Sequence, residues 1–222
     1  FQAVKLLIQN SKSINLDINK TDKDGLTGFH MACINKQEEI VDYIINNAEE
    51  FDIDLLLKTK NDKTGLGMYF REVCEQGDLK NLQKLLTFQN INFNETDEHG
   101  QTAFFYACGM GQFQAVKLLI QNSKSLNLNL NKANVNEMTG FHSACSNKHE
   151  EIVDFMINNA EEFGIDLSLK NKNGRTGYDL WPEKFAFRSI INNIHGCVAT
   201  MTNTLKDTKM TSPSNLNNDL NF

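Results

Sequence analysis

The chain has 222 residues, of which 40% are apolar, and its formal net charge is −6. Nucleic acids and anionic membranes attract basic surfaces, so this charge argues against both as partners. No run of about 18 apolar residues occurs, which excludes a membrane-spanning helix. An aromatic content of 9% and only two prolines argue against a β-rich domain.

The chain opens inside a repeated pattern. Residues 1–65 recur without a gap as residues 113–177, and the two copies are identical at 46 of 65 positions and differ at 19. Residues 1–8 therefore correspond to residues 113–120, and we expect them to form the second helix of a unit whose first helix is missing. Because the first residue is Phe1, we expect a fragment or processed product, before which a targeting segment could be missing.

The first complete unit begins at a tight turn. Gly25 follows Asp24 there and can take the positive φ that such turns require. Thr27 is expected to cap a helix over residues 28–35, because its hydroxyl can accept hydrogen bonds from free amides of the first turn. A second helix is predicted over residues 38–50, where apolar residues recur at helical spacing opposite an acidic, solvent-exposed face.

A shorter signature divides the chain into smaller units. The signature consists of an aromatic residue, a small apolar residue three positions later, and a cysteine directly after that. It occurs four times, at residues 29–33, 70–74, 104–108 and 141–145. The steps from cysteine to cysteine are 41, 34 and 37 residues. A period in this range indicates a solenoid, in which each unit buries its apolar face only against its neighbours.

The second unit departs from the regular pattern. Residues 66–69 form an extra stretch between the Thr64-Gly65 pair and Phe70. We therefore expect the regular stacking to break at an irregular junction near residues 58–69.

The C-terminal part is expected to cap the array. Residues 171–196 form a last unit, in which Pro182 stops the first helix and a final helix is predicted over residues 183–195. Residues 197–222 are rich in Thr, Asn, Ser and Lys, and we predict a disordered tail there.

These units resemble the ankyrin repeat. The family pattern of an Asp-Gly turn, a Thr, an apolar residue, His, and two small residues is met by residues 24–33, and similar matches lie at 100–108 and 139–145. The resemblance extends from residue 1 to about residue 181. It implies an all-α fold, an ankyrin-type α-solenoid of about five to six stacked helix-turn-helix repeats with extended or β-turn loops, filling residues 1–196. The family proline is replaced by Gly28, Ala103 and Gly140.

Candidate catalytic and metal-binding residues are better explained by structure. Cysteine is readily buried, and sulfurs on neighbouring stacked helices lie about 10 Å apart, too far for a shared tetrahedral metal or a disulfide. The resemblance implies that His30 and His142 brace their turns. Adjacent glutamates point about 100° apart on a helix and do not converge, and no phosphate-binding or nucleophile motif occurs. We predict no enzyme activity, no catalytic or metal-binding residue, no cofactor and no small-molecule substrate.

The resemblance implies protein binding through the turn tips and the concave face made by the first helix of each unit. The positions that match in this chain, our candidate partner-binding residues, are Lys23, Asp24, Leu26, Ile34, Asn35, Glu98, His99, Gln101, Met110, Val135, Asn136, Met138, Ser146 and Asn147. In the duplicated block four of the five candidate positions differ between the copies. Turns also tolerate change, so binding and drift explain this divergence equally well.

We therefore predict a non-catalytic protein-interaction module or scaffold with an unidentified protein partner. Unpaired cysteines favour a reducing environment, so an intracellular, cytoplasmic location is expected. One alternative is a structural spacer, or a targeting or regulatory segment, of a larger multidomain protein. A second is a substrate for asparagine hydroxylation, because the resemblance places Asn19 and Asn131 in the loop position modified in some ankyrin repeats. A hydrolase or transferase would need convergent polar groups, and the sequence displays none.

Overall fold

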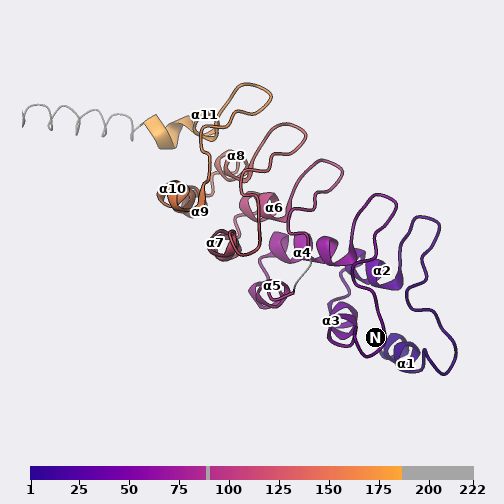
Figure 1. The fold of residues 1–222 in the computed structure, drawn as a ribbon. Coiled ribbons are helices and arrows are strands. Elements are labelled where there is room, and N and C mark those ends of the chain that lie inside the picture. Colours follow the sequence, from indigo (N-terminus) through magenta and orange to yellow (C-terminus); the bar gives the residue numbers. More distant parts are fainter. Residues whose placement is uncertain (89–90, 187–222) are drawn as a thin grey trace, which may run out of the picture. The chain divides into compact units, whose positions relative to one another are not determined.

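The structure, a computed structural model, describes residues 1–88 and 91–186. Figure 1 shows two rows of helices, an inner row of α2, α4, α6, α8 and α11 and an outer row of α1, α3, α5, α7 and α9. The described residues contain no strand, only two isolated β-bridges, which confirms the predicted all-α class. The helices are α1 Gln2–Gln9, α2 Gly28–Ile34, α3 Glu38–Asn46, α4 Gly65–Gln76, α5 Leu79–Leu85, α6 Ala103–Gly109, α7 Phe113–Asn122, α8 Gly140–Ser146, α9 Glu150–Asn158, α10 Ala160–Phe163 and α11 Gly177–Leu180.

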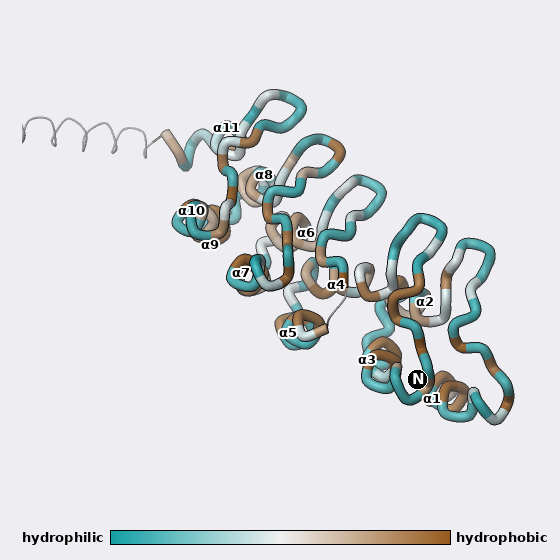
Figure 2. The backbone as a smooth tube through the Cα atoms, viewed as in Figure 1, coloured by the Kyte–Doolittle hydropathy of each residue, from teal (hydrophilic) through white to brown (hydrophobic). Residues whose placement is uncertain are grey.

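Five turn tips project beyond the inner row. In each tip the N–H of the first residue donates to the carbonyl of the residue four positions later. Figure 2 shows these tips as mostly hydrophilic, while the helices carry most of the apolar segments. In chain order the tips are residues 22–26, 59–63, 97–101, 134–138 and 171–175.

Threonine caps fix where the inner helices begin. The Thr27 hydroxyl accepts from the N–H of His30, and the His30 imidazole accepts in return from the N–H of Thr27 at 3.2 Å. The same reciprocal pair forms between Thr139 and His142. These bonds satisfy amides that the first turn leaves free, which confirms both the predicted cap and the bracing role of the histidines.

Three pairs of inner helices stack through an aromatic residue on one helix and a glycine at the start of the next, at Gly65, Gly140 and Gly177. A Cβ on Gly65 would lie 2.6 Å from the Phe29 ring, and one on Gly177 would lie 2.5 Å from the Phe141 ring. Only glycine permits so close an approach of helix backbone to ring. At Gly65, Gly140 and Gly177 the missing family proline therefore has a packing reason, whereas a Cβ on Gly28 would have no atom within 4 Å. Phe29 and Phe141 are at most 3% exposed.

The extra residues of the second unit lengthen a helix instead of interrupting the array. Helix α4 has 12 residues, whereas α2, α6 and α8 have seven each. Four added residues are close to the 3.6 of one turn, so the register of the buried face is preserved. Leu66 and Tyr69 of the added turn are 2% and 3% exposed. At the predicted irregular junction, residues 65–76 thus form one continuous helix.

Other predicted boundaries change at the ends of elements. Helix α3 ends at Asn46, short of the predicted residue 50, because the Asn47 side chain donates to the Tyr43 carbonyl and caps the helix. Helix α11 ends two residues before Pro182, as the sequence indicates. The compact unit that contains the array runs from Phe1 to Leu180. The predicted final helix is described only to residue 186, and the predicted tail lies outside the described residues.

Candidate partner-binding site

Each turn tip is held by the side chain of its first residue. The Asp22 carboxylate accepts from the N–H groups of Asp24 and Leu26, at 2.8 and 2.9 Å. The hydrogen bond from the Leu26 N–H contributes most to lowering the pKa of Asp22, and the one from the Asp24 N–H lowers it further. Asp97, Asn134 and Asn171 hold the third to fifth tips in the same way. The variable residues between these bonds are thereby presented on a rigid frame.

Backbone hydrogen bonds join most neighbouring tips. Lys60 N–H donates to the Asp24 carbonyl at 3.0 Å, Val135 to His99 at 2.9 Å, and Lys172 to Asn136 at 3.1 Å. Among the described residues, no such bond joins the second tip to the third. That interval is also where the added turn of α4 lies, so the regular spacing of the tips changes there.

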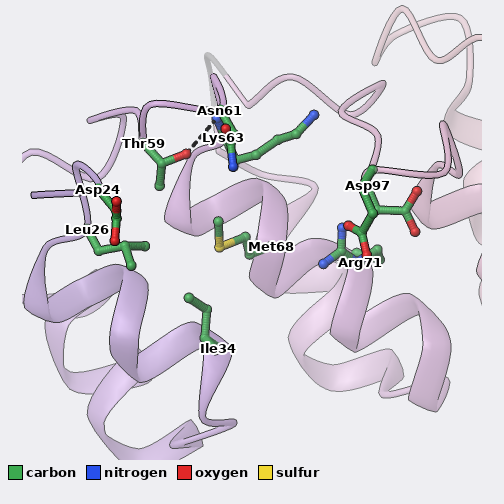
Figure 3. A pocket seen from close by; sticks show the side chains of 10 residues that line it. Asp24, Leu26, Ile34, Thr59, Asn61, Lys63, Met68, Arg71 and Asp97 are labelled. Atoms are coloured by element: carbon green, nitrogen blue, oxygen red, sulfur yellow. Dashed lines mark hydrogen bonds between the residues drawn. The ribbon is translucent and has the colours of Figure 1, made fainter.

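A hollow of about 630 Å³ opens at this interval. Figure 3 shows Leu26, Ile34 and Met68 directed toward one another on one side, with Arg71 beside Asp97 on the other. Ile34 is 47% exposed although it is a large apolar residue. The hollow is lined by Asp24, Leu26, Ile34, Thr59, Asn61, Lys63, Met68, Arg71, Asp97 and Glu98.

The far wall of the hollow is an organised polar cluster. The Tyr106 hydroxyl donates to the Asp97 carboxylate at 2.7 Å, and the Arg71 guanidinium lies 5.9 Å from the centre of the Tyr106 ring. Burial alone would raise the pKa of Asp97, but the bonds from Tyr106 and the tip amides, together with Arg71, lower it overall. Burial and the bond to Asp97 raise the pKa of Tyr106 to about 12. At neutral pH this wall therefore presents a carboxylate and a guanidinium in fixed positions.

Four of the predicted contact residues come together in this hollow, namely Asp24, Leu26, Ile34 and Glu98. Two others, Asn35 and Asn147, have a structural role, because their side-chain amides donate to Met31 and Ser143 carbonyls and end their own helices. The remaining candidates are outside the lining of the hollow, and they are Lys23, His99, Gln101, Met110, Val135, Asn136, Met138 and Ser146. Met110 and Val135 are nevertheless 52% and 50% exposed.

Sequence reasoning missed the second tip and the added turn of α4. Met68 and Arg71 belong to a stretch that looked irregular, so no contact position was assigned there. A signal was present, because residues 59–65 align with residues 171–177 in the duplicated block. This alignment marks residues 59–63 as a complete turn tip, in addition to the other four. Only the folded helix shows that the added turn places Met68 beside Leu26.

The four signature cysteines and His142 lie in the buried part of the array. Cys33, Cys74, Cys108 and Cys145 are buried and are in no disulfide, and burial raises the pKa of Cys33 to about 12. Burial lowers the pKa of His142, whose neutral ring accepts from Thr139 and reaches the Arg175 carbonyl at 3.1 Å. The part of the chain that the structure describes holds no group of three or more His, Cys, Asp or Glu that could bind a metal. No helix within it is long and apolar enough to cross a membrane.

Asparagine side chains connect successive loops through hydrogen bonds. Asn131 donates to the Gly164 carbonyl at 2.7 Å and accepts from the Asp166 N–H at 2.8 Å. Asn19 and Asn94 make the equivalent pair of bonds to the loops that follow them. Their position is thus explained by structure, and hydroxylation of Asn19 and Asn131 stays a prediction.

We expect Asn131→Ala to lower the free energy of unfolding by about 1 to 2 kcal/mol, because it removes two inter-loop hydrogen bonds at once. Urea denaturation followed by circular dichroism measures the change. Asn173→Ala is the matched control, since Asn173 is exposed on a turn tip, and it should change stability by less than about 0.5 kcal/mol. Equal effects of the two substitutions would show that the bridges are not stabilising.

Comparisons with known proteins agree with this geometry. A family model described as "Ankyrin repeats (3 copies)" matches residues 70–176, and one described as "Ankyrin repeats (many copies)" matches residues 1–45. The chain therefore belongs to the ankyrin-repeat family, whose members are in general protein-interaction modules. The acyl-CoA-binding domain-containing protein 6 homolog of Dictyostelium discoideum is 34% identical over 67 residues, which cover 30% of this chain and 22% of that protein. The chain thus spans about a fifth of the length of that relative.

Proposed function

We propose that this ankyrin array is a non-catalytic module that binds a protein partner at the hollow between its first three turn tips. The observation that carries the proposal is the convergence of Leu26, Ile34 and Met68, which come from two units and leave apolar surface open to solvent. Apolar side chains gathered on an otherwise polar surface are typical of the centre of a protein interface.

Charged side chains around this apolar centre would orient a bound partner. Asp24, Asp97 and Glu98 contribute carboxylates, and Lys63 and Arg71 contribute cations. An apolar centre with a charged rim resembles the anatomy of protein interfaces in general. The net charge of −6 supports a partner with a basic patch, whose attraction would act mainly on the association rate.

The test compares two triple variants of the intact chain as baits in affinity capture from cell lysate. One variant carries Leu26→Ser, Ile34→Ser and Met68→Ser inside the hollow. The other carries Met110→Ser, Val135→Ser and Met138→Ser, which alter exposed or half-buried apolar residues outside it. Circular dichroism first verifies that both variants fold like the original chain.

We expect a partner that is captured by the original chain and the second variant, and whose Kd for the first variant rises at least about tenfold, or 1.4 kcal/mol. If capture of the partner were lost only with the second variant, the contact surface would lie around Met110, Val135 and Met138 and not at the hollow. Identical capture by all three baits would favour the spacer alternative. The similarity to only a fifth of a longer protein also supports that alternative.

We also propose that the module works in a reducing, intracellular compartment. Four cysteines among the described residues are buried without forming disulfides, and such thiols are typical of proteins kept under reducing conditions.

A further inference from the structure

Two backbone groups between the second and third turn tips lack the bond that joins the other neighbouring tips. In each joined pair, the N–H of a tip's second residue donates to the carbonyl of the third residue in the preceding tip. The corresponding groups at this interval are the Glu98 N–H and the Asn61 carbonyl. Within residues 1–88 and 91–186 neither group has a hydrogen-bond partner, and both residues line the hollow.

A single peptide group of a partner could bridge this open donor and acceptor. The C=O and N–H of a trans peptide group point in opposite directions. Its carbonyl can therefore accept from the Glu98 N–H while its N–H donates to the Asn61 carbonyl. Open backbone groups of this kind bind extended segments at the free edges of sheets, so the interval can accept an extended backbone.

Arg71 is a charged group of the hollow whose hydrogen-bonding capacity is open. Among the described residues its guanidinium lies over the Tyr106 ring and makes no ion pair. The Asp97 carboxylate, by contrast, already accepts from the N–H groups of His99 and Gln101 and from the Tyr106 hydroxyl. The guanidinium can therefore bind a carboxylate from outside, in the two-bond geometry that arginine favours.

The added turn of α4 explains why a cation is available at this position. The residue directly after the signature aromatic is His30 in the first unit and His142 in the fourth, and each is 1% exposed and braces its cap. In the second unit this residue is Arg71, but the cap is Thr64, one turn further back. Arg71 thus has no bracing role, and Figure 3 shows its side chain at the hollow.

We propose that the hollow binds an extended segment of a partner protein that carries a large apolar residue and a carboxylate two positions apart. This inference rests on the proposed function of the hollow as the partner site. The apolar side chain would pack against Leu26, Ile34 and Met68, and the carboxylate would bind the Arg71 guanidinium. The peptide group that bridges the second and third tips lies between these two side chains.

The spacing within the segment follows from α4. Met68 and Arg71 are three positions apart on this helix, so their Cβ atoms lie about 5–6 Å apart on one face. In an extended segment, side chains two positions apart point to the same side and lie about 7 Å apart. The two separations match closely enough for both contacts to form at once.

The other charges of the hollow restrict where the acidic side chain can lie. Asp24 and Glu98 are exposed carboxylates of the lining, and they repel an acidic residue that is not placed on Arg71. The net charge of −6 attracts basic surfaces at long range and acts mainly on the association rate. We therefore expect the acidic residue of the segment to lie within a basic surface of the partner.

The test selects peptides from a phage-displayed library of random sequences, with the intact chain as the target. Enriched peptides should share a large apolar residue and an Asp or Glu two positions away. Fluorescence polarisation then measures the Kd of the most enriched peptide. Arg71→Gln should raise this Kd at least about tenfold, because a charge-assisted pair is lost. Replacing the peptide's acid by its amide should weaken binding to the original chain equally, and binding to the Arg71→Gln variant much less.

Two controls separate the pair from general effects of charge and fold. Arg175→Gln removes the same charge from an exposed position on the fifth tip and should leave the Kd unchanged. N-methylation of the peptide, one nitrogen at a time, should raise the Kd about three- to tenfold at a nitrogen between the two shared side chains, because the donor to the Asn61 carbonyl is lost. Circular dichroism verifies that both arginine variants keep the original fold.

Two results would overturn the proposal. One is enrichment of peptides with Lys or Arg in place of the acid, which would assign the polar contact to Asp24 and Glu98. The other is a Kd that Arg71→Gln leaves unchanged. If the variant with Leu26→Ser, Ile34→Ser and Met68→Ser still loses binding in either case, only the assigned occupant is wrong. Peptide binding that survives this triple variant would overturn the proposed function of the hollow itself.

Discussion

Leu119→Ala is expected to lower the free energy of unfolding by about 3 kcal/mol, whereas Leu7→Ala should change it by less than about 0.5 kcal/mol. Both leucines occupy the same position in an identical stretch of sequence. Leu119 is fully buried between helices, and Leu7 is 51% exposed. Removing a buried leucine side chain loses apolar burial and leaves a cavity, while an exposed one has little burial to lose.

Chemical denaturation of the two variants and the original chain measures this difference. The comparison should be made at matched urea concentrations with the slope of the transition reported, because repeat arrays do not always unfold in one step. Similar losses for both leucines would mean that the Leu7 side chain is covered in solution, and would contradict the exposure seen in the structure.

Glu95→Ala is expected to destabilise the array by about 2 kcal/mol, because it removes a cap that the second unit receives from the next loop. The Glu95 carboxylate accepts from the Thr64 hydroxyl at 2.7 Å and from the Thr64 N–H at 3.3 Å. In the first and fourth units an imidazole, His30 or His142, makes these contacts. The equivalent position in the second unit is Gly67, and the carboxylate fills the space that its missing side chain leaves.

A double-mutant cycle tests this substitution of one cap for another. Gly67→His alone should displace the Glu95 carboxylate from Thr64, since a Cβ on Gly67 takes the space that the carboxylate fills. Combined with Glu95→Ala, the same histidine has room to bind Thr64 and should recover about 1 kcal/mol or more relative to Glu95→Ala alone. Additive losses for the two substitutions would show that the carboxylate does not stand in for the imidazole.

The repeated pattern was enough to predict the units and the starts of their inner helices. Thr27 and Thr139 cap where the spacing of turn and apolar residues placed them, because capping depends on residues only three positions apart. The added turn of α4 could not be recognised as helix, since a four-residue insertion looks the same in sequence whether it interrupts a helix or lengthens it. Burial of Leu66 and Tyr69 against the neighbouring units decides that it lengthens the helix.

The candidate site was predicted only in part for a related reason. The sequence indicated which positions face outward within one unit, and Asp24, Leu26, Ile34 and Glu98 do line the hollow. It could not indicate which units combine, because the hollow depends on how the second and third tips are spaced. Met68 and Arg71 enter the site through that spacing.

Residues 1–13 and 113–125 are identical, and the sequence alone determined that both segments form an outer helix of an ankyrin unit. Helix formation follows from local propensity and apolar spacing, which the two copies share. Only the tertiary structure decided how deeply individual side chains of each copy are buried, as Leu7 and Leu119 show. Burial depends on residues distant in the chain, so identical segments can have the same local structure and present different surfaces.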